Sequence, residues 1–243
     1  MIKGKKIVAM IPARIGSKRI IKKNLRLING KPLISYIINT LKSVKIFDDI
    51  YLNADDKIFK VIAQENGIKF YNREKVLASD NATNDEFALD FMKNIDADIL
   101  IQVLPTSPLI RADEIEDFTE FMLMQELETL ISVEHKQIAS LYEEKTLNFD
   151  KYKKNPPSQE MTPVKAYATV LMGWEYKSFK NNMQKYGCAY HGGDSKIDYF
   201  QLEGLSTIDI DNEEDFILVD AIINAQVQQK NLQKIEIKYF ENS

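Results

Sequence analysis

Short apolar segments alternate with segments of helical pattern along most of the chain, and this alternation limits the possible folds more than any other feature. The segments that we expect to form strands in the first half are residues 6–12, 49–54, 68–71, 98–104 and 129–133. The spacing of apolar residues predicts helices over residues 32–43, 57–66, 85–94 and 112–125. Strands that alternate with helices of about ten residues are typical of a doubly wound, mostly parallel α/β sheet, which binds ligands at the carboxyl ends of its strands.

The alternation is interrupted over residues 134–159, where the sequence is polar, contains many lysines and ends in NPPSQ. We interpret this stretch as an excursion from the sheet rather than as a second core. The alternation then resumes, and it predicts a strand over residues 167–174, a short strand over 206–211 and a helix over 213–226. The expected organisation is one α/β domain made of residues 1–133 and 160–228, with the excursion between them and a polar tail over residues 229–243.

The composition excludes several classes of protein. The formal net charge of −4 argues against a general nucleic-acid-binding protein. No apolar stretch approaches the roughly 20 residues that span a bilayer, and no signal-peptide cleavage pattern follows the first apolar run, so we expect a cytoplasmic protein without a membrane anchor. One cysteine and two histidines cannot form a zinc site of the usual kind, so any metal ion is expected to have oxygen ligands.

A basic loop follows the first predicted strand. Three of the five arginines of the chain, Arg14, Arg19 and Arg26, lie within thirteen residues there, together with Lys18 and Lys23. The loop lacks a Walker pattern, but Gly16 lets its backbone approach a ligand closely. Free N–H groups and several cations can bind a polyphosphate and neutralise the charge of a leaving pyrophosphate. The loop therefore predicts a polyphosphate site at the carboxyl edge of the sheet.

An acidic pair precedes the last predicted helix. Asp209 and Asp211 alternate along the short strand expected over residues 206–211, so both should point to one face of it. Mg²⁺ takes one or two carboxylates together with phosphate oxygens and water, and this pair could hold it against a triphosphate. The alternative is that one of the two caps the following helix, a position that Asn212 also suits.

Several segments resemble the CMP-N-acetylneuraminate synthetase (acylneuraminate cytidylyltransferase) family in order and spacing: IPARIGSKRIIKKN, NGKPLISYIINTL, NADD, NREKVLASDNAT, PTSPLIRADEI and IDIDNEEDF. The resemblance covers residues 5–220. It implies a nucleotide-binding α/β domain with an arm that pairs with a second subunit in a homodimer. It also implies transfer of CMP from CTP to the anomeric hydroxyl of an acidic, sialic-acid-like sugar, with Mg²⁺ as cofactor and pyrophosphate as product, in the synthesis of bacterial surface glycans.

The resemblance also assigns site residues. It implies catalytic roles for Arg14, Lys18, Lys23 and Asp209, of which the three cations would contact the triphosphate and Asp209 could accept the hydroxyl proton. The expected nucleotide-binding residues are Ala13, Arg14, Ser17, Lys18, Lys23, Asn24, Arg73, Ala82 and Asn84, with Asn24 and Arg73 next to the cytosine. The expected acceptor residues are Leu104, Thr106, Ser107, Gln159 and Lys165, and the expected metal ligands are Asp209 and Asp211.

The acceptor half departs from the family pattern. Leu104 stands where a glutamine is common, and Pro157 and Ser158 stand where an arginine pair is common. No arginine follows Arg111, so a lysine such as Lys165 would have to replace bidentate recognition of a sugar carboxylate. The alternatives are therefore a 3-deoxy-manno-octulosonate cytidylyltransferase or one with another acceptor, a CTP-binding protein without activity, and a metal-dependent glycosyltransferase.

Overall fold

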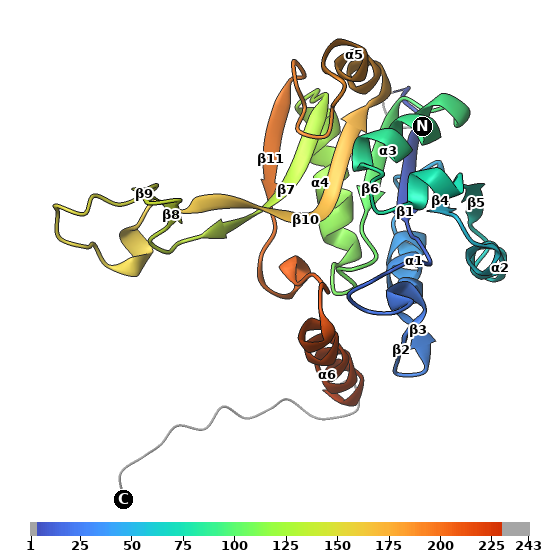
Figure 1. Cartoon of the computed structure of the whole chain (residues 1–243), viewed down its shortest axis with the longest axis horizontal. Coiled ribbons are helices and arrows are strands. Elements are labelled where there is room, and N and C mark those ends of the chain that lie inside the picture. Colours follow the sequence, from blue (N-terminus) through green and yellow to red (C-terminus); the bar gives the residue numbers. More distant parts are fainter. Residues whose placement is uncertain (1–3, 230–243) are drawn as a thin grey trace, which may run out of the picture.

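The computed structural model describes residues 4–229, and a seven-stranded sheet forms its centre (Figure 1). The strands stand in the order β11-β7-β10-β6-β1-β4-β5. Their bounds are Ile7–Pro12 for β1, Asp49–Ala54 for β4, Lys69–Asn72 for β5, Ile99–Val103 for β6, Thr129–Lys136 for β7, Val164–Glu175 for β10 and Ile197–Gln201 for β11. β10 runs antiparallel to both neighbours and every other pair of the described sheet is parallel, which confirms the predicted mostly parallel sheet.

Helices cover both faces of the sheet. The bounds are Leu33–Ser43 for α1, Lys57–Glu65 for α2, Asn84–Asn94 for α3, Ala112–Met124 for α4, Tyr176–Tyr186 for α5 and Glu213–Gln229 for α6. Side chains of α1, α2 and α4 pack on one face against Ile7, Ala9 and Ile11 of β1. Those of α3 and α5 pack on the other face against Val8 and Met10. Because successive residues of a strand point to opposite faces, a strand covered on both sides is apolar throughout, as β1 is.

A third, smaller core joins the basic loop to the C-terminal helix. Ile20 and Ile28, which flank the 3-10 helix η1 (Lys23–Leu25), pack with Ile210 and with Phe216 and Val219 of α6. The short hairpin of β2 (Leu27–Ile28) and β3 (Lys31–Pro32) follows η1 and leads into α1. Because Ile20 and Ile28 are buried in this core, both ends of the segment between them, residues 21–27, are held in place.

The structure corrects the sequence-based elements in two places. The strand expected over residues 206–211 is wrong, because the 3-10 helix η4 (Gly204–Thr207) precedes an unpaired extended segment. The alternation of Asp and Ile arises because Ile210 is buried in the small core while the aspartates face the other way. α5 and β11 were not predicted. α5 is mostly polar, and only a short face of it is buried. The helix is capped by Gly187, whose φ of 73° is left-handed.

The segment between β7 and β10 projects away from the sheet (Figure 1). We call residues 137–163 the arm; it carries β8 (Leu141–Tyr142), β9 (Lys145–Thr146) and the 3-10 helix η3 (Ser158–Glu160). The bounds of the arm differ from the excursion expected over residues 134–159 at both ends, because β7 continues to Lys136 and β10 begins only at Val164. Val164 of β10 pairs with Lys136 of β7, so the arm leaves and re-enters the sheet through paired residues.

The tail expected over residues 229–243 lies outside the described residues, apart from Gln229, where α6 ends. Within residues 4–229, none of the helices combines the length and the hydropathy needed to cross a membrane.

Candidate active site

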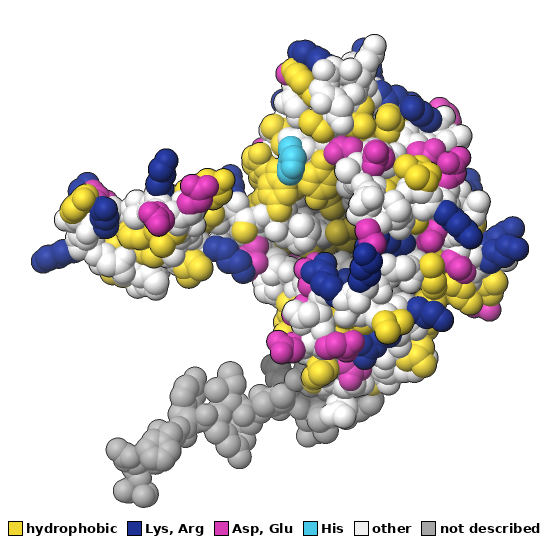
Figure 2. Space-filling view, in the orientation of Figure 1, with side chains coloured by type: hydrophobic (Ala, Val, Ile, Leu, Met, Phe, Trp, Pro, Cys, Tyr) yellow, Lys and Arg dark blue, Asp and Glu magenta, His cyan; other side chains and the backbone are white. Residues whose placement is uncertain are grey.

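A cleft of about 430 Å³ opens where β1 and β6 end. Figure 2 shows this side of the molecule, on which basic side chains gather beside a hollow with a hydrophobic wall. Side chains from the basic loop, from the ends of β5 and β6, from the loop before α3 and from α3 itself line the cleft: Pro12, Ala13, Arg14, Ser17, Lys18, Arg19, Lys23, Asn24, Arg73, Asp80, Phe87, Leu104, Pro105 and Thr106. The structure therefore brings together most of the predicted nucleotide-binding residues, at the edge of the sheet where the sequence places them.

Backbone hydrogen bonds fix the course of the basic loop. The N–H of Ala13 donates to the carbonyl of Asn53 at 2.9 Å, and the N–H of Ile15 donates to the carboxylate of Asp55 at 3.2 Å. Lys22 then turns the chain with a left-handed φ of 51°, an uncommon conformation for a residue other than glycine. Ile20, which lies between Ile15 and Lys22, is buried in the core. The cationic side chains of the loop, in contrast, line the cleft.

Four cations of the loop, which line the cleft, each have a partner in another segment of the chain. Arg14 donates to Asp80 at 3.0 Å, and Lys18 lies 2.5 Å from the same carboxylate. Arg19 pairs with Asp211 at 2.8 Å, and Lys23 donates to the carbonyl of Ile210. Burial lowers the pKa of Lys23, against the opposing charges of Asp209 and Asp211. Lys23 is thus a partly desolvated cation placed directly beside the acidic pair.

Two deeply buried polar residues of the cleft keep an unpaired atom. Asn24 is 7% exposed and its Oδ1 accepts no hydrogen bond, while Arg73 is 4% exposed and its Nε donates none. The Arg73 guanidinium donates to the carbonyl of Ala13 and lies 4.8 Å from the centre of the Phe87 ring. Burial lowers the pKa of Arg73 to about 10. Since buried polar atoms are nearly always paired, an unpaired acceptor and an unpaired donor in one cleft suit a ligand.

Asn84, one of the predicted nucleotide-binding residues, pairs with an amide that the sequence analysis did not single out. Asn84, the first residue of α3, accepts a hydrogen bond of 2.8 Å from Nε2 of Gln102, which is fully buried in β6. Ala82 lies in the loop before α3, and neither Ala82 nor Asn84 is among the side chains that line the cleft. A polar residue inside an apolar strand was the only available sign of Gln102.

The acidic pair lies at the same edge. Asp209 accepts a hydrogen bond of 3.4 Å from Oγ of Ser107. Burial raises the pKa of Asp209, and its hydrogen bonds to Thr106 and Ser107 and the charge of Lys23 only partly oppose this. A desolvated carboxylate is a better proton acceptor than an ordinary aspartate.

Neither carboxylate of the pair is needed as a helix cap. Asn212 accepts a hydrogen bond of 3.0 Å from the N–H of Asp215, which fits the cap predicted for α6. The Asp215 carboxylate in turn accepts from the N–H groups of Asp211 and Asn212. The capping alternative for Asp209 and Asp211 is therefore wrong.

The acidic pair fits a hard cation only in part. In residues 4–229 no group of three or more His, Cys, Asp or Glu side chains is placed to hold a metal ion. Asp209 and Asp211 supply two carboxylates, although Asp211 is paired with Arg19. Mg²⁺ commonly takes one or two carboxylates and completes its shell with phosphate oxygens and water, so the donor set fits Mg²⁺ that arrives with a phosphate ligand.

The acceptor is expected at the part of the cleft around Leu104 and Thr106, which we call the acceptor side. Leu104 and Thr106 line the cleft, and Leu104 belongs to the same core cluster as Tyr167 and Tyr190. We call Tyr167, Tyr190, His191 and Tyr199 the aromatic surface; their neighbouring ring centres lie 4.9 to 6.2 Å apart. The Tyr167 hydroxyl and Nδ1 of His191 lie 3.3 Å apart. The aromatic surface was not predicted, because its members come from three separate segments.

The two acceptor residues expected from the second half of the chain lie elsewhere. Lys165, on β10, has its Nζ 5.7 Å from the ring centre of Tyr199, at the edge of the aromatic surface. Gln159 lies on η3 of the arm, where its carbonyl accepts a hydrogen bond from Gln137. The structure thus places Lys165 near the acceptor side and does not bring Gln159 to the cleft of the same chain.

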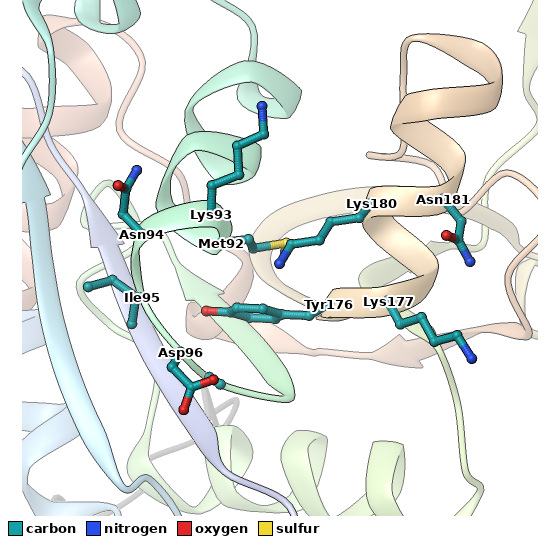
Figure 3. Close-up of a pocket in the computed structure, with 10 residues that line it drawn as sticks. Met92, Lys93, Asn94, Ile95, Asp96, Tyr176, Lys177, Lys180 and Asn181 are labelled. Atoms are coloured by element: carbon teal, nitrogen blue, oxygen red, sulfur yellow. The ribbon is translucent and has the colours of Figure 1, made fainter.

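A second hollow, of about 510 Å³, lies between the end of α3 and the start of α5. In Figure 3, Lys93, Lys177 and Lys180 border it together with the ring of Tyr176. It lies at the amino end of β6, whereas doubly wound sheets bind their ligands at the carboxyl ends. It contains none of the predicted site residues, so the smaller cleft is the better candidate despite its size.

Comparisons with known proteins agree with this geometry. The N-acylneuraminate cytidylyltransferase of Escherichia coli O18:K1:H7 (strain RS218 / NMEC) is 27% identical over 253 residues, which cover 96% of this chain and 54% of that protein. The pseudaminic acid cytidylyltransferase of Campylobacter jejuni subsp. jejuni serotype O:2 is 32% identical over 133 residues, which cover 52% of this chain and 57% of that protein. The chain thus spans about half the length of the curated N-acylneuraminate relative.

A solved structure shares the fold. CMP:2-keto-3-deoxy-manno-octonic acid synthetase complexed with CTP superposes with a TM-score of 0.71 at 19% identity, covering 91% of this chain and 99% of that one. At the level of sequence, a model described as cytidylyltransferase matches residues 8–186. The matched residues include the basic loop, Arg73 and the whole of β6, and they confirm the resemblance found in the sequence. This chain belongs to the cytidylyltransferase family.

Proposed function

We propose that this chain transfers CMP from CTP to the anomeric hydroxyl of an acidic, sialic-acid-like sugar of the nonulosonate class and releases pyrophosphate. One observation carries the proposal. The cations of the basic loop, the unpaired buried atoms of Asn24 and Arg73, and the desolvated carboxylate of Asp209 meet at the carboxyl edge of one α/β sheet. The cations suit a triphosphate, the unpaired atoms suit a base, and the carboxylate suits the proton that the acceptor hydroxyl loses.

The nucleotide fills the side of the cleft formed by the basic loop. Arg14, Lys18 and Lys23 bind the triphosphate, with Ser17 and the backbone of Ala13 alongside. The unpaired Oδ1 of Asn24 can accept a hydrogen bond from the amino group of cytosine, a group that uracil lacks. Nε of Arg73 can donate to an acceptor on the same base. This arrangement favours CTP over UTP.

The transfer is an in-line displacement at the α-phosphorus. The anomeric oxygen forms a bond to phosphorus, the bond between phosphorus and the bridging oxygen breaks, and pyrophosphate leaves. Asp209 accepts the hydroxyl proton, a role that its raised pKa suits. Lys23, next to Asp209, stabilises the negative charge that develops on the phosphates. Mg²⁺, held by Asp209 and Asp211 with phosphate oxygens, would supply further charge neutralisation when bound.

The sugar occupies the acceptor side of the cleft. Leu104 and Thr106 line this side, Ser107 is fully buried and donates a hydrogen bond to Asp209, and Lys165 offers the positive charge that a sugar carboxylate requires. The curated relatives described above are named for N-acylneuraminate and pseudaminic acid, which are acidic nine-carbon sugars. Their names favour a nonulosonate acceptor over an octulosonate, and a product that enters a surface glycan.

The chain acts as a homodimer through the arm. Large apolar side chains of the arm are more than half exposed, namely Ile138, Leu141, Tyr142, Leu147 and Tyr152. Such exposure suits burial against a second copy. Gln159 would then reach an acceptor site across the interface. The cytoplasm, which supplies CTP, is the compartment that this proposal implies.

Pyrophosphate release tests the proposal. The protein is incubated with CTP and Mg²⁺ and with one of four acidic sugars: N-acetylneuraminate, legionaminate, pseudaminate or 3-deoxy-manno-octulosonate. We expect release with a nine-carbon member, and little release when UTP replaces CTP. CTP binding without release for any sugar would leave a nucleotide-binding protein and overturn the transferase proposal. Release with the octulosonate alone would overturn the acceptor class.

A further inference from the structure

One side chain of the cleft has the wrong charge for a triphosphate site. Among the described residues that line the cleft, Asp80 is the only acidic one, while Arg14, Lys18, Arg19, Lys23 and Arg73 are cationic. A carboxylate in this position repels phosphate oxygens. Its presence next to the cations therefore requires an explanation other than nucleotide binding.

Asp80 joins two loops of the cleft. Its Oδ1 accepts a hydrogen bond from Arg14 at 3.0 Å, and its Oδ2 lies 2.5 Å from Nζ of Lys18. Arg14 also reaches the carbonyls of Ala78 and Ser79, at 3.4 and 3.3 Å. One carboxylate thus holds two cations of the basic loop against the loop that leads into α3.

The same two cations are the ones that a triphosphate needs. A phosphate oxygen that binds Arg14 and Lys18 has to compete with the Asp80 carboxylate for their N–H groups. The side chain of Asp80 is 44% exposed and those of Arg14 and Lys18 are 39% and 77% exposed, so solvent screens the ion pairs and they can exchange partners. A buried pair would not exchange in this way.

We propose that Asp80 is an exchangeable counter-ion: it positions Arg14 and Lys18 in the cleft, yields them to the triphosphate, and takes them back when pyrophosphate leaves. The inference rests on the proposed function, because it assumes that these cations bind phosphate. Asp80 is a positioning residue in this scheme and contacts no reacting atom. It weakens the binding of substrate and of pyrophosphate alike, and thereby speeds product release.

The test measures affinity in the intact chain by titration calorimetry, with inorganic tripolyphosphate, pyrophosphate and CTP as probes. Asp80→Asn keeps the size of the side chain and removes its charge, and Asp80→Glu keeps the charge. Asp113→Asn is the matched control, because Asp113 pairs with Arg111 at 3.0 Å on the surface, outside the cleft. Its removal changes the net charge by the same amount.

We expect Asp80→Asn to bind tripolyphosphate and pyrophosphate about three- to tenfold more tightly than the unaltered protein, because two exposed ion pairs no longer compete. Asp80→Glu and Asp113→Asn should stay within about twofold. The gain in affinity should shrink at high ionic strength. Pyrophosphate should inhibit Asp80→Asn more strongly than it inhibits the unaltered protein.

Other results would overturn the inference, the proposed function or both. Weaker binding by Asp80→Asn would mean that Asp80 only holds the loops in place, and an equal gain in Asp113→Asn would mean a general charge effect. If the unaltered protein binds tripolyphosphate but not CTP, the proposed function fails while the counter-ion role is still decided by the inorganic probes. Binding of neither probe by the unaltered protein or by Asp80→Asn would overturn both.

Discussion

The basic loop lines the cleft, and Tyr167 and Tyr190 of the aromatic surface share a core cluster with Leu104 of the same cleft, yet the side chains of the two regions are held in different ways. In the basic loop, Arg14, Lys18 and Lys23 have charged or carbonyl partners supplied by other segments of the chain. On the aromatic surface the rings contact mainly each other, and Tyr199 is 38% exposed. The difference teaches that the proposed nucleotide half is organised by ion pairs and hydrogen bonds within one chain, whereas the proposed acceptor half offers ring contacts and Lys165. The following tests act on one half at a time.

The largest effect is expected from Lys23→Ala. Lys23 is the partly buried cation beside the acidic pair, and loss of one preorganised charge of this kind costs about 10² to 10³ in kcat. Steady-state pyrophosphate release measures it. The control is Lys22→Asn, which removes the exposed neighbouring charge and suits the left-handed backbone at that position. Equal losses in both variants would show that total loop charge, rather than the position of Lys23, matters.

Asp209→Asn should lower kcat by about 10²-fold and leave CTP binding within about threefold, because the amide cannot accept the hydroxyl proton. Asp211→Asn should mainly raise the Mg²⁺ concentration needed for half-maximal rate, with the rate recovered at high Mg²⁺. Rate measurements across a Mg²⁺ titration separate the two variants. Full turnover of Asp209→Asn at saturating Mg²⁺ would rule out Asp209 as the proton acceptor.

Lys165→Ala should raise the KM for the acceptor sugar about tenfold and leave the KM for CTP unchanged, since Lys165 lies only on the acceptor side. Lys165→Arg should restore most of the loss because it keeps the charge. Both constants come from initial rates with one substrate varied at a time. A parallel change in the KM for CTP would show that the two halves of the cleft are coupled.

The smallest change in the nucleotide half is expected from the arm. Replacing Leu141 and Tyr142 with serine removes exposed apolar surface from β8 and should weaken dimerisation about tenfold or more. Sedimentation velocity measures the dimer, and calorimetry should find CTP affinity unchanged within about twofold. A dimer of unaltered stability would exclude β8 from the interface.

The sequence predicts best those elements that are covered on both faces. β1 and β4 match their expected bounds within one residue because their apolar runs end at polar or proline residues. α5 was missed because polar residues dominate it. Residues 206–211 show the alternation of a strand because one side of this segment is buried, although the segment is not part of the sheet. Nothing in the sequence marks the role of Asp80, and only its place as a polar residue within an apolar strand marks Gln102. Their roles come from partners 66 and 18 residues away, and only the folded chain supplies these.

The pairing of Val164 with Lys136 has a consequence for how this protein can change over evolution. Because the two ends of the arm are neighbours in the sheet, about 5 Å apart, a tight turn could replace the arm without a break in β7 or β10. The arm can therefore change in length or sequence, by insertion, deletion or exchange, without disturbing the strands that carry the cleft. Under the proposed function, pairing partners and sugar preference could change by recombination at this one point while the nucleotide side is inherited unchanged.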